Sequence, residues 1–570
     1  MAGARVTAIT GYHGHTNGSV LDVFRARAVA DPDGEALRTM DGACYTWRTW
    51  HEASRSFAAA VGTLHLEPGS RVAILAGNRP LWPIADIGTL FAGMIAVGIY
   101  PTSAPAQVEE LLADCDARVI VVDTPEQLDK VIAVRSRLPR LRKIIALQGD
   151  GSTVTGWDAW LSRGALALQQ DPAVAIGLDT VARGNKSIDT ALLIYTSGST
   201  GRPKAAKISY ECLRASADSV IETLGLTSAD SSLSFLPFCH AGERMFGLYT
   251  RIVAGMPCLL VTDHHDLWRA ARAYEPTLFG GLPRFYEKVS AALRVAETRG
   301  ADAESRHRTI ATFFGTRLRL ATSGGATLPV EVAEHLASYG VTVLGAYGST
   351  EHLCTAFHRP GRHAFDSVGW PMPGTEIRIA DDGEVLIRRS ALTFSGYLNR
   401  DAETREAFTE DGEWLLTGDL GSISPDGALH ITGRKKELIA LSNGKKVAPL
   451  RIEAALTDGQ WISSAMVYGE GKKFLSALLC LGRPAAESWA RAHGVTSDFV
   501  QLADHPEIRA AVQTVVERAN ANVNNAERVR RWVLLPHEFS VDGGELTPTL
   551  KLRRADIVTR YGSLLDSLYS

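Results

Sequence analysis

The chain has 570 residues, of which 45% are hydrophobic and 22% charged, and its formal net charge is −3. These values are ordinary for a soluble globular protein and argue against a broad nucleic-acid-binding surface. The length exceeds that of one compact core and predicts several domains. Seven cysteines lie far apart without a CxxC pair. They argue against a disulfide framework or a zinc site and favour a reducing compartment.

The first 150 residues alternate between helical and extended patterns. Residues 19–30 predict a helix with Ser19 as its N-cap. Residues 71–77 form a short apolar run of the kind that is buried in parallel sheets. The alternation continues with a helix and two strands, predicted over 107–115, 118–123 and 143–148. This repeated order predicts a large α/β body with mostly parallel sheets and flanking helices.

The longest apolar stretch, residues 84–101, carries Asp86 and falls short of the roughly 20 residues that a membrane-spanning helix needs. We interpret it as a buried helix that runs into a strand. The N-terminal residues lack the apolar core of a secretion signal. The expected location is therefore cytoplasmic.

The pattern changes after residues 430–439, where the predicted elements become shorter. A helix near 450–456 precedes two strands within 463–481 and a further helix over 506–523. The predicted fold class is α/β. A large N-terminal body over residues 1–433, with a small β-rich part, precedes a smaller α+β domain over residues 434–570.

A candidate phosphate-binding loop follows an apolar strand pattern that ends at Tyr195. The next nine residues, TSGSTGRPK, are rich in glycine and hydroxyl groups and end on Lys204. Glycines let backbone N–H groups turn toward an anion, while hydroxyl and ammonium groups add donors and charge. The spacing is not that of a Walker A loop. Composition alone leaves a flexible linker as the alternative.

Further segments accompany this loop. They are TSGGA (322–326), GAYGSTE (345–351), LLTGDLG (415–421), ITGRKKELI (431–439) and ELTPTLKLRR (545–554). With YTSGSTGRPK they make the chain resemble the adenylate-forming superfamily over nearly its whole length. The segments LSFLPFCHAGERM (233–245) and PTLFGGLPRFYEKV (276–289) resemble those of long-chain fatty acyl-CoA synthetases in particular.

The resemblance implies two half-reactions. A carboxylate attacks the α-phosphate of ATP to give acyl-AMP and pyrophosphate, and the thiol of CoA then attacks the mixed anhydride. No protein nucleophile is needed, so the implied task of the protein is positioning and charge stabilisation. The implied ligands are ATP, Mg²⁺, CoA and a medium-to-long-chain or bulky apolar carboxylic acid.

The resemblance also assigns roles to residues. Phosphate-binding groups are Thr196, Ser197, Gly198, Ser199, Thr200, Gly201 and Lys204. Adenine is expected beside Gly324, Gly325, Ala326, Tyr347 and Gly348, with an ordinary core position as the alternative for Tyr347. Glu351 and Thr200 are the expected Mg²⁺ ligands, because Mg²⁺ takes one or two carboxylates and completes its shell with phosphate and water. Thr350 is expected at the α-phosphate, and Asp419 with Arg434 at the ribose hydroxyls.

Lys551 is implied to neutralise charge while the two anions of the first step meet. His240 is expected near the acyl carboxylate, and a neutral core histidine is the alternative. Lys436 marks the expected hinge about which the C-terminal domain rotates between two poses. In the second pose, a CoA channel is expected along Ser442, Asn443, Gly444 and Lys445.

Three positions depart from the pattern of the superfamily. Ala205 stands where relatives have glycine and is expected to tilt the following strand slightly. Asn443 also stands for a glycine, which we expect it to replace because asparagine tolerates a left-handed backbone conformation better than most residues. Lys446 stands for asparagine, which leaves two readings: it favours an anionic acceptor such as CoA, or it alters the channel.

Two alternative functions remain at this point. One is a fatty acyl-AMP ligase that passes the acyl group to a carrier-protein thiol. The other is a non-catalytic acyl-binding relative, which the presence of Lys551, Glu351 and Asp419 argues against. The apolar segment 245–249 is a further candidate, for peripheral contact with the inner face of a membrane. No nucleic-acid partner is expected.

Overall fold

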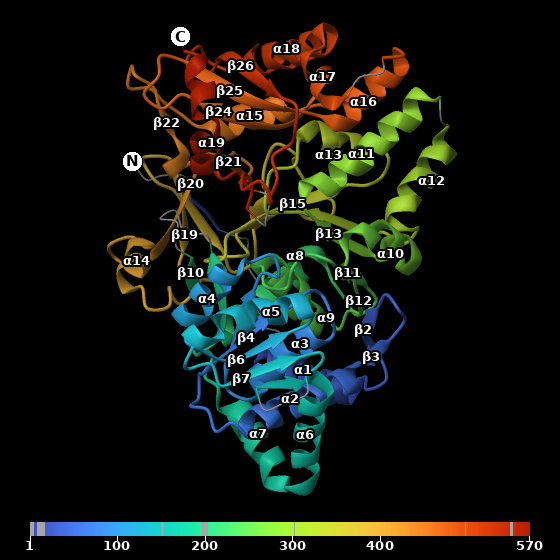
Figure 1. The fold of residues 1–570 in the computed structure, drawn as a ribbon, viewed down its shortest axis with the longest axis vertical. Helices are drawn as coiled ribbons and strands as arrows, with labels where there is room; N and C mark the ends of the chain where they lie inside the picture. Colours follow the sequence, from blue (N-terminus) through green and yellow to red (C-terminus); the bar gives the residue numbers. More distant parts are fainter. Residues whose placement is uncertain are drawn as a thin grey trace.

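The structure is a computed structural model that describes residues 5–7, 18–149, 153–196, 203–300, 302–495, 498–521, 523–547 and 551–569. Figure 1 shows an elongated molecule whose C-terminal elements, in orange and red, gather at one end of the long axis. No helix in these ranges is both long and apolar enough to span a bilayer. The segment 84–101 forms helix α3 (Leu81–Phe91) and strand β5 (Ile95–Ile99), as predicted.

A seven-stranded sheet forms the centre of the first α/β unit. Its spatial order is β10 (Lys204–Ser209), β9 (Thr190–Thr196), β5, β4 (Arg71–Leu75), β6 (Ala117–Val122), β7 (Lys143–Ala146) and β8 (Val154–Gly156). All neighbours are parallel except β9 and β10. This is the mostly parallel sheet that the βα alternation predicts.

Helices cover both faces of this sheet. Apolar side chains of α4 (Pro105–Asp114) and α5 (Pro125–Val134) pack on one face. The other face packs against α1 (Val20–Ala30), α2 (Trp47–Gly62) and α3, with α6 (Trp157–Gln170) and α7 (Pro172–Gly184) outside them. Helix α1 begins after Ser19, whose side chain caps it as predicted.

A nine-stranded sheet forms the second unit. Its order is β17 (Trp370–Pro371), β16 (Ala356–Phe357), β15 (Val343–Tyr347), β14 (Leu320–Ser323), β13 (Leu278–Gly281), β11 (Ser232–Ser234), β12 (Cys258–Leu260), β2 (Glu35–Thr39) and β3 (Cys44–Thr46). An aromatic-rich core packs it against α10 (Leu267–Tyr274), α11 (Pro283–Thr298), α12 (Ala303–Phe314) and α13 (Val330–Ala337). Between the two sheets lie α8 (Tyr210–Leu224), the π-helical segment η2 (Gly242–Tyr249) and α9 (Thr250–Ala254).

The predicted β-rich part is an antiparallel five-stranded sheet. Its order is β1 (Arg5–Thr7), β18 (Glu376–Ile379), β19 (Glu384–Arg388), β20 (Trp414–Ile423) and β21 (Leu429–Arg434), and the short helix α14 (Asp401–Glu406) precedes β20. A 3₁₀ turn, η4 (Lys435–Glu437), leads from β21 into the C-terminal elements.

The C-terminal elements have hydrophobic cores of their own. A sheet of β24 (Ile462–Tyr468), β25 (Leu475–Leu481) and β26 (Val529–Leu535) accompanies the hairpin of β22 (Ile439–Ala440) and β23 (Lys446–Val447). The helices are α15 (Pro449–Thr457), α16 (Arg483–Ala492), α17 (Phe499–Asp504), α18 (Pro506–Ala521) and α19 (Arg554–Ser567). The predicted α+β composition of this part is confirmed.

Candidate active site

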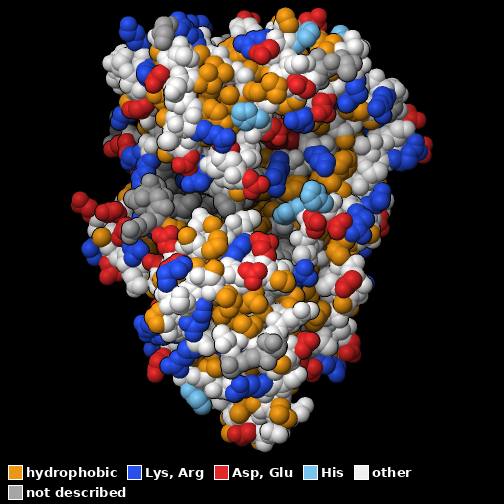
Figure 2. Space-filling view, viewed as in Figure 1, with side chains coloured by type: hydrophobic (Ala, Val, Ile, Leu, Met, Phe, Trp, Pro, Cys, Tyr) orange, Lys and Arg blue, Asp and Glu red, His pale blue; other side chains and the backbone are white. Residues whose placement is uncertain are grey.

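Part of the predicted site lies together, where elements of all three large sheets approach the C-terminal part: Lys204, Tyr347, Glu351, Asp419, Arg434 and Lys551. Lys204 opens β10, Tyr347 ends β15, and Asp419 and Arg434 lie in β20 and β21. Lys551 lies shortly before α19. Figure 2 shows this face of the molecule hollowed between the C-terminal elements and the body, with charged side chains at the rim.

The centre of the candidate phosphate loop, Ser197, Gly198, Ser199, Thr200 and Gly201, lies outside the described residues. Its two ends are described. Thr196 and Lys204 face each other across the antiparallel β9–β10 pair, and Thr196 Oγ1 lies 3.4 Å from the Lys204 carbonyl oxygen. The residues on both sides of the loop therefore belong to one antiparallel strand pair at the edge of a sheet, and not to two different domains.

Asp419 sits at the centre of a polar cluster. Its cross-strand partner is Arg434, whose Nε lies 2.9 Å from the Asp419 carboxylate, and the Tyr347 hydroxyl donates to the same carboxylate at 2.6 Å. Burial raises the pKa of Asp419, and the charge of Arg434 and the Tyr347 hydrogen bond oppose that shift. A buried carboxylate with two fixed donors offers its remaining acceptor positions in a defined direction.

The backbone around Tyr347 explains the glycines of two motifs. A Cβ atom at Gly348 would lie 1.9 Å from the Leu353 carbonyl oxygen, so only glycine fits. Gly325 has φ 81°, a conformation that favours glycine. Gly324 passes close to Ala346, with 3.4 Å between a Cβ placed there and the Ala346 Cβ. Ala326, beside these glycines, is exposed. Tyr347 is half-buried with its hydroxyl on Asp419, so it is part of the polar cluster rather than a plain core residue.

Glu351 follows the turn that contains Thr350. Tyr397 donates a hydrogen bond of 2.7 Å to Glu351 Oε1, and Lys204 Nζ lies 5.4 Å from the centre of the Tyr397 ring. Among the described residues, no group of three or more His, Cys, Asp or Glu side chains could hold a metal ion by itself. One carboxylate beside a phosphate loop fits a Mg²⁺ ion that takes most of its ligands from phosphate and water.

Lys551 lies within electrostatic reach of several of these groups. Loss of hydration among the surrounding groups lowers the pKa of Lys551, as does the charge of Arg434, whereas Asp419 and Glu351 oppose the shift. The pKa of His240 is lowered to about 4 by burial and by the charge of Lys551. His240 Nδ1 accepts a hydrogen bond of 3.1 Å from the Gly242 N–H. His240 is therefore neutral at physiological pH, and its place near the acyl carboxylate stays a prediction.

The turn that contains Asn443 does not use, at this residue, the left-handed conformation that asparagine tolerates. Asn443 does not have a positive φ. Gly444 does (81°), and Asn443 Oδ1 instead accepts from the Lys445 N–H at 3.0 Å. Strand β10 keeps a continuous register with β9 from Lys204 to Ile208, and a tilt of this strand after Ala205 stays a prediction. Ser442, Asn443, Gly444, Lys445 and Lys446 are exposed in and beside the β22–β23 turn, and Lys436 is exposed in η4.

The prediction that segment 245–249 contacts a membrane is wrong. Met245, Leu248 and Tyr249 are at most 2% exposed, because the segment belongs to η2 in the core between the sheets. The Tyr249 hydroxyl donates to buried Asp86 at 2.7 Å, and Arg244 pairs with the same carboxylate. An apolar run of this length does not distinguish a surface patch from a buried helix.

Two residues of the candidate site were not predicted from the sequence. Tyr397 links Glu351 to Lys204, but only a Gly-Tyr step marks it in the sequence. Glu437, 3.5 Å from Arg554 Nε, lies near enough to act on the pKa of both Asp419 and Lys551. Glu437 stands within the motif segment ITGRKKELI, and this position could have indicated it as a site residue.

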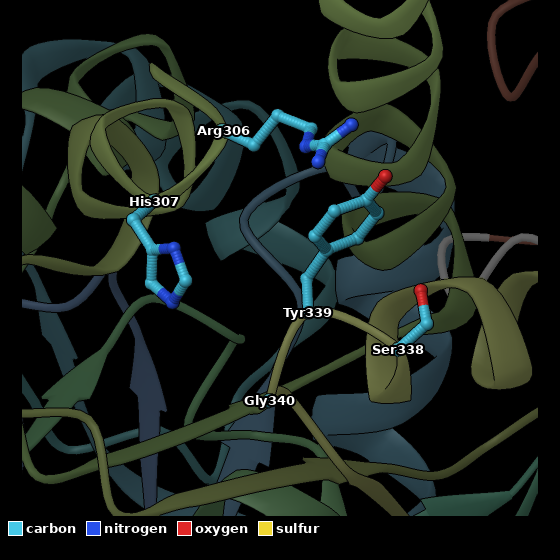
Figure 3. A pocket seen from close by; sticks show the side chains of 5 residues that line it. All are labelled: Arg306, His307, Ser338, Tyr339 and Gly340. Atoms are coloured by element: carbon cyan, nitrogen blue, oxygen red, sulfur yellow. The ribbon is translucent and has the colours of Figure 1, made fainter. Parts of the chain in front are cut away.

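A second hollow lies apart from these residues. Figure 3 shows it between α12 and the turn after α13, with the Arg306 side chain beside the ring of Tyr339, whose centre lies 5.5 Å from the guanidinium carbon. None of the predicted site residues lines it.

The chain matches known proteins over nearly its whole length. It matches the AMP-binding enzyme family over residues 24–398 and the C-terminal domain of AMP-binding enzymes over residues 436–570. A long-chain-fatty-acid–CoA ligase of Mycobacterium bovis is 32% identical over 589 residues, covering 95% of each chain. One of Rattus norvegicus is 29% identical over 585 residues, covering 90% of this chain and 80% of that protein.

Solved structures share the fold. The anthranilate CoA ligase AuaEII in complex with anthranoyl-AMP has a TM-score of 0.80 at 21% identity, covering 97% of this chain and 98% of that one. A Mycobacterium tuberculosis fatty acyl CoA synthetase has a TM-score of 0.66 at 20% identity, covering 96% and 99%. At these identities the similarity concerns the fold alone.

Proposed function

Because the chain belongs to the AMP-binding enzyme family, we propose that it activates a fatty acid with ATP to acyl-AMP and transfers the acyl group to CoA, releasing AMP. Full-length relatives named long-chain-fatty-acid–CoA ligases support the fatty acid and CoA assignments. The observation that carries the proposal is the Asp419–Arg434–Tyr347 cluster, with Lys551 within electrostatic reach of Asp419, Arg434 and Glu351.

In the first step a carboxylate oxygen attacks the α-phosphorus of ATP, and the bond to the bridging oxygen of pyrophosphate breaks. Both reactants are anions, so the barrier is largely electrostatic. Lys551 supplies a positive charge from the C-terminal part, and Lys204 supplies one from the phosphate-loop hairpin. Thr350 donates to the α-phosphate. His240, neutral at physiological pH, adds no charge beside the acid.

The nucleotide is held through its sugar and base. The Asp419 carboxylate accepts from the ribose hydroxyls, while Arg434 and Tyr347 keep it in place. The ring of Tyr347 offers an aromatic face for adenine. Glu351 would hold Mg²⁺, which supplies charge neutralisation at the phosphates when bound.

In the second step the thiol of CoA attacks the acyl carbon, and AMP leaves with the electron pair of the broken C–O bond. The C-terminal domain has rotated about Lys436 for this step. The exposed turn of Ser442, Asn443, Gly444 and Lys445 then lines the path of the pantetheine arm, and Lys446 adds a positive charge for the CoA phosphates. In this proposal the N-terminal domain comprises residues 1–433 and the C-terminal domain comprises residues 434–570.

Pyrophosphate release across acids from acetate to long-chain fatty acids, each with and without CoA, tests this proposal. Release that rises with chain length and proceeds through many turnovers only with CoA is the expected result. Release that stops near one equivalent even with CoA indicates another acceptor, such as a carrier-protein thiol. No release with any acid contradicts the enzymatic function.

A further inference from the structure

The segment 393–398 joins the phosphate-loop hairpin to the turn that carries Glu351. We propose that Tyr397, on this segment, is a positioning residue that fixes the Glu351 carboxylate relative to the Lys204 ammonium, so that a nucleotide and its metal ion meet both groups in one geometry. The inference rests on the proposed function and adds a residue to its site.

Backbone hydrogen bonds place the segment between the two motifs. The N–H of Leu398 donates to the carbonyl oxygen of Ala205 at 2.9 Å, which attaches the segment to β10. The N–H of Phe394 donates to the carbonyl oxygen of Glu351 at 2.9 Å. The same few residues therefore contact the hairpin on one side and the Glu351 turn on the other.

The orientation of Tyr397 is itself fixed. Its N–H donates to Thr404 Oγ1 at 2.8 Å, and its ring packs edge-on against Phe394 at 4.9 Å. Gly396, immediately before it, has φ 113°, and a Cβ atom there would lie 2.6 Å from Thr404 Cγ2. The close approach to Thr404 thus requires glycine at this position, and it holds Tyr397 in place.

The side chain of Tyr397 contacts both charged groups. Its hydroxyl donates to Glu351 Oε1 at 2.7 Å, and the face of its ring lies 5.4 Å from Lys204 Nζ. The first contact orients one oxygen of the Glu351 carboxylate. The other oxygen, Oε2, accepts no hydrogen bond within the described residues. The second is a cation–π contact that restrains a flexible lysine. Prior orientation of both groups reduces the entropy lost when the ligand binds.

The test measures binding of a non-hydrolysable ATP analogue by calorimetry, once with Mg²⁺ and once with EDTA. Tyr397→Phe removes the hydroxyl and keeps the ring, whereas Tyr397→Leu removes both contacts. The matched control is Tyr339→Phe, which removes another tyrosine–carboxylate hydrogen bond, to Glu297, at the separate hollow of Figure 3.

We expect Tyr397→Phe to lose about tenfold in affinity with Mg²⁺ and less than about twofold in EDTA, the size of one hydrogen bond to a charged group. Tyr397→Leu weakens binding in both conditions. In a Glu351→Gln background the Phe substitution has no further effect on the Mg²⁺-dependent part, because its partner is gone. The Tyr339→Phe control binds as the wild type does.

Unchanged Mg²⁺-dependent binding in Tyr397→Phe overturns the inference, and so does an equal loss in the Glu351→Gln background. Melting temperatures of the variants separate a loss of folding from a loss of binding. A wild-type protein that binds no ATP analogue contradicts the proposed function itself, and the inference with it. These two failures are distinguishable because the second is read from the wild type alone.

Discussion

The hydroxyl of Tyr347 donates a hydrogen bond of 2.6 Å to the carboxylate of Asp419, although the two residues belong to different sheets. This bond joins the nine-stranded sheet to the antiparallel sheet at the proposed nucleotide site. Arg434, opposite Asp419 on β21, completes the cluster. One carboxylate thus fixes the relative position of the groups assigned to the base and the sugar.

Asp419→Asn tests this cluster. Asparagine keeps the volume but loses the charge and one acceptor oxygen, so we expect ATP affinity to fall about tenfold or more. Discrimination between ATP and its 2′-deoxy and 3′-deoxy analogues should disappear as well, as measured by competition binding. The control Asp426→Asn changes an exposed turn aspartate between β20 and β21 and should leave both quantities unchanged. A variant that still discriminates would remove Asp419 from the ribose site.

Lys551→Ala should separate the two half-reactions. Loss of one charge aimed at the transition state typically costs about 100-fold or more in rate. We expect that loss in acid-dependent pyrophosphate formation, while conversion of synthetic acyl-AMP and CoA to acyl-CoA changes little. The control is Arg553→Ala, since Arg553 pairs with Asp556 within the C-terminal part. Equal losses in both half-reactions would contradict the assigned role.

Stability should decrease in acid through a buried histidine. Burial lowers the pKa of His352 to about 4, so between about pH 6.5 and about pH 4 the unfolded chain binds a proton that the folded chain does not. The free energy of unfolding therefore falls as the pH falls, by up to about 3 kcal/mol for this group.

The measurement for His352 is the melting temperature of the large body at several pH values. His352→Gln should show a shallower decrease in acid than the wild type. The exposed His265→Gln variant should keep the wild-type slope. Equal slopes for His352→Gln and wild type would show that His352 titrates normally.

The arrangement of the domains should respond to pH through two carboxyl groups. Asp458, after α15, faces Glu331 of α13, and its buried Oδ1 has no hydrogen-bond partner among the described residues. Burial and Glu331 raise the pKa of Asp458, against the charges of Arg518 and Arg294. A proton on Asp458 thus stabilises this arrangement, and that stabilisation is lost as the pH rises through the raised pKa.

Small-angle X-ray scattering can follow this response. In the wild type, the population of the arrangement in which Asp458 faces Glu331 should decrease as the pH rises through the raised pKa of Asp458. Asp458→Asn, which cannot lose a proton, should reduce that change. A variant that responds to pH as the wild type does would exclude this contact as the cause.

Most of the fold was predictable because its strands and helices carry regular apolar periods. The βα alternation, the capping by Ser19 and the helix–strand pair in 84–101 are confirmed, and the family resemblance is confirmed by the matches. Asp419 and Arg434 were predicted together, and they lie together because β20 and β21 are paired neighbours.

The remaining features depend on tertiary structure. Tyr397 reaches Glu351 through an irregular segment, and no local pattern indicates that pairing. The contact of Asp458 with Glu331 depends on how the C-terminal part is oriented. The segment 245–249 was misassigned because burial between two sheets is decided by elements far away in the sequence.

Transfer of ¹⁸O tests the central claim most directly. A fatty acid labelled with ¹⁸O in both carboxylate oxygens is converted with ATP and CoA, and the masses of AMP and inorganic products are measured. Attack of the carboxylate on the α-phosphorus predicts one ¹⁸O atom in AMP and none in pyrophosphate. Unlabelled AMP, with the label in inorganic phosphate or retained in the acid, would contradict an acyl-AMP intermediate.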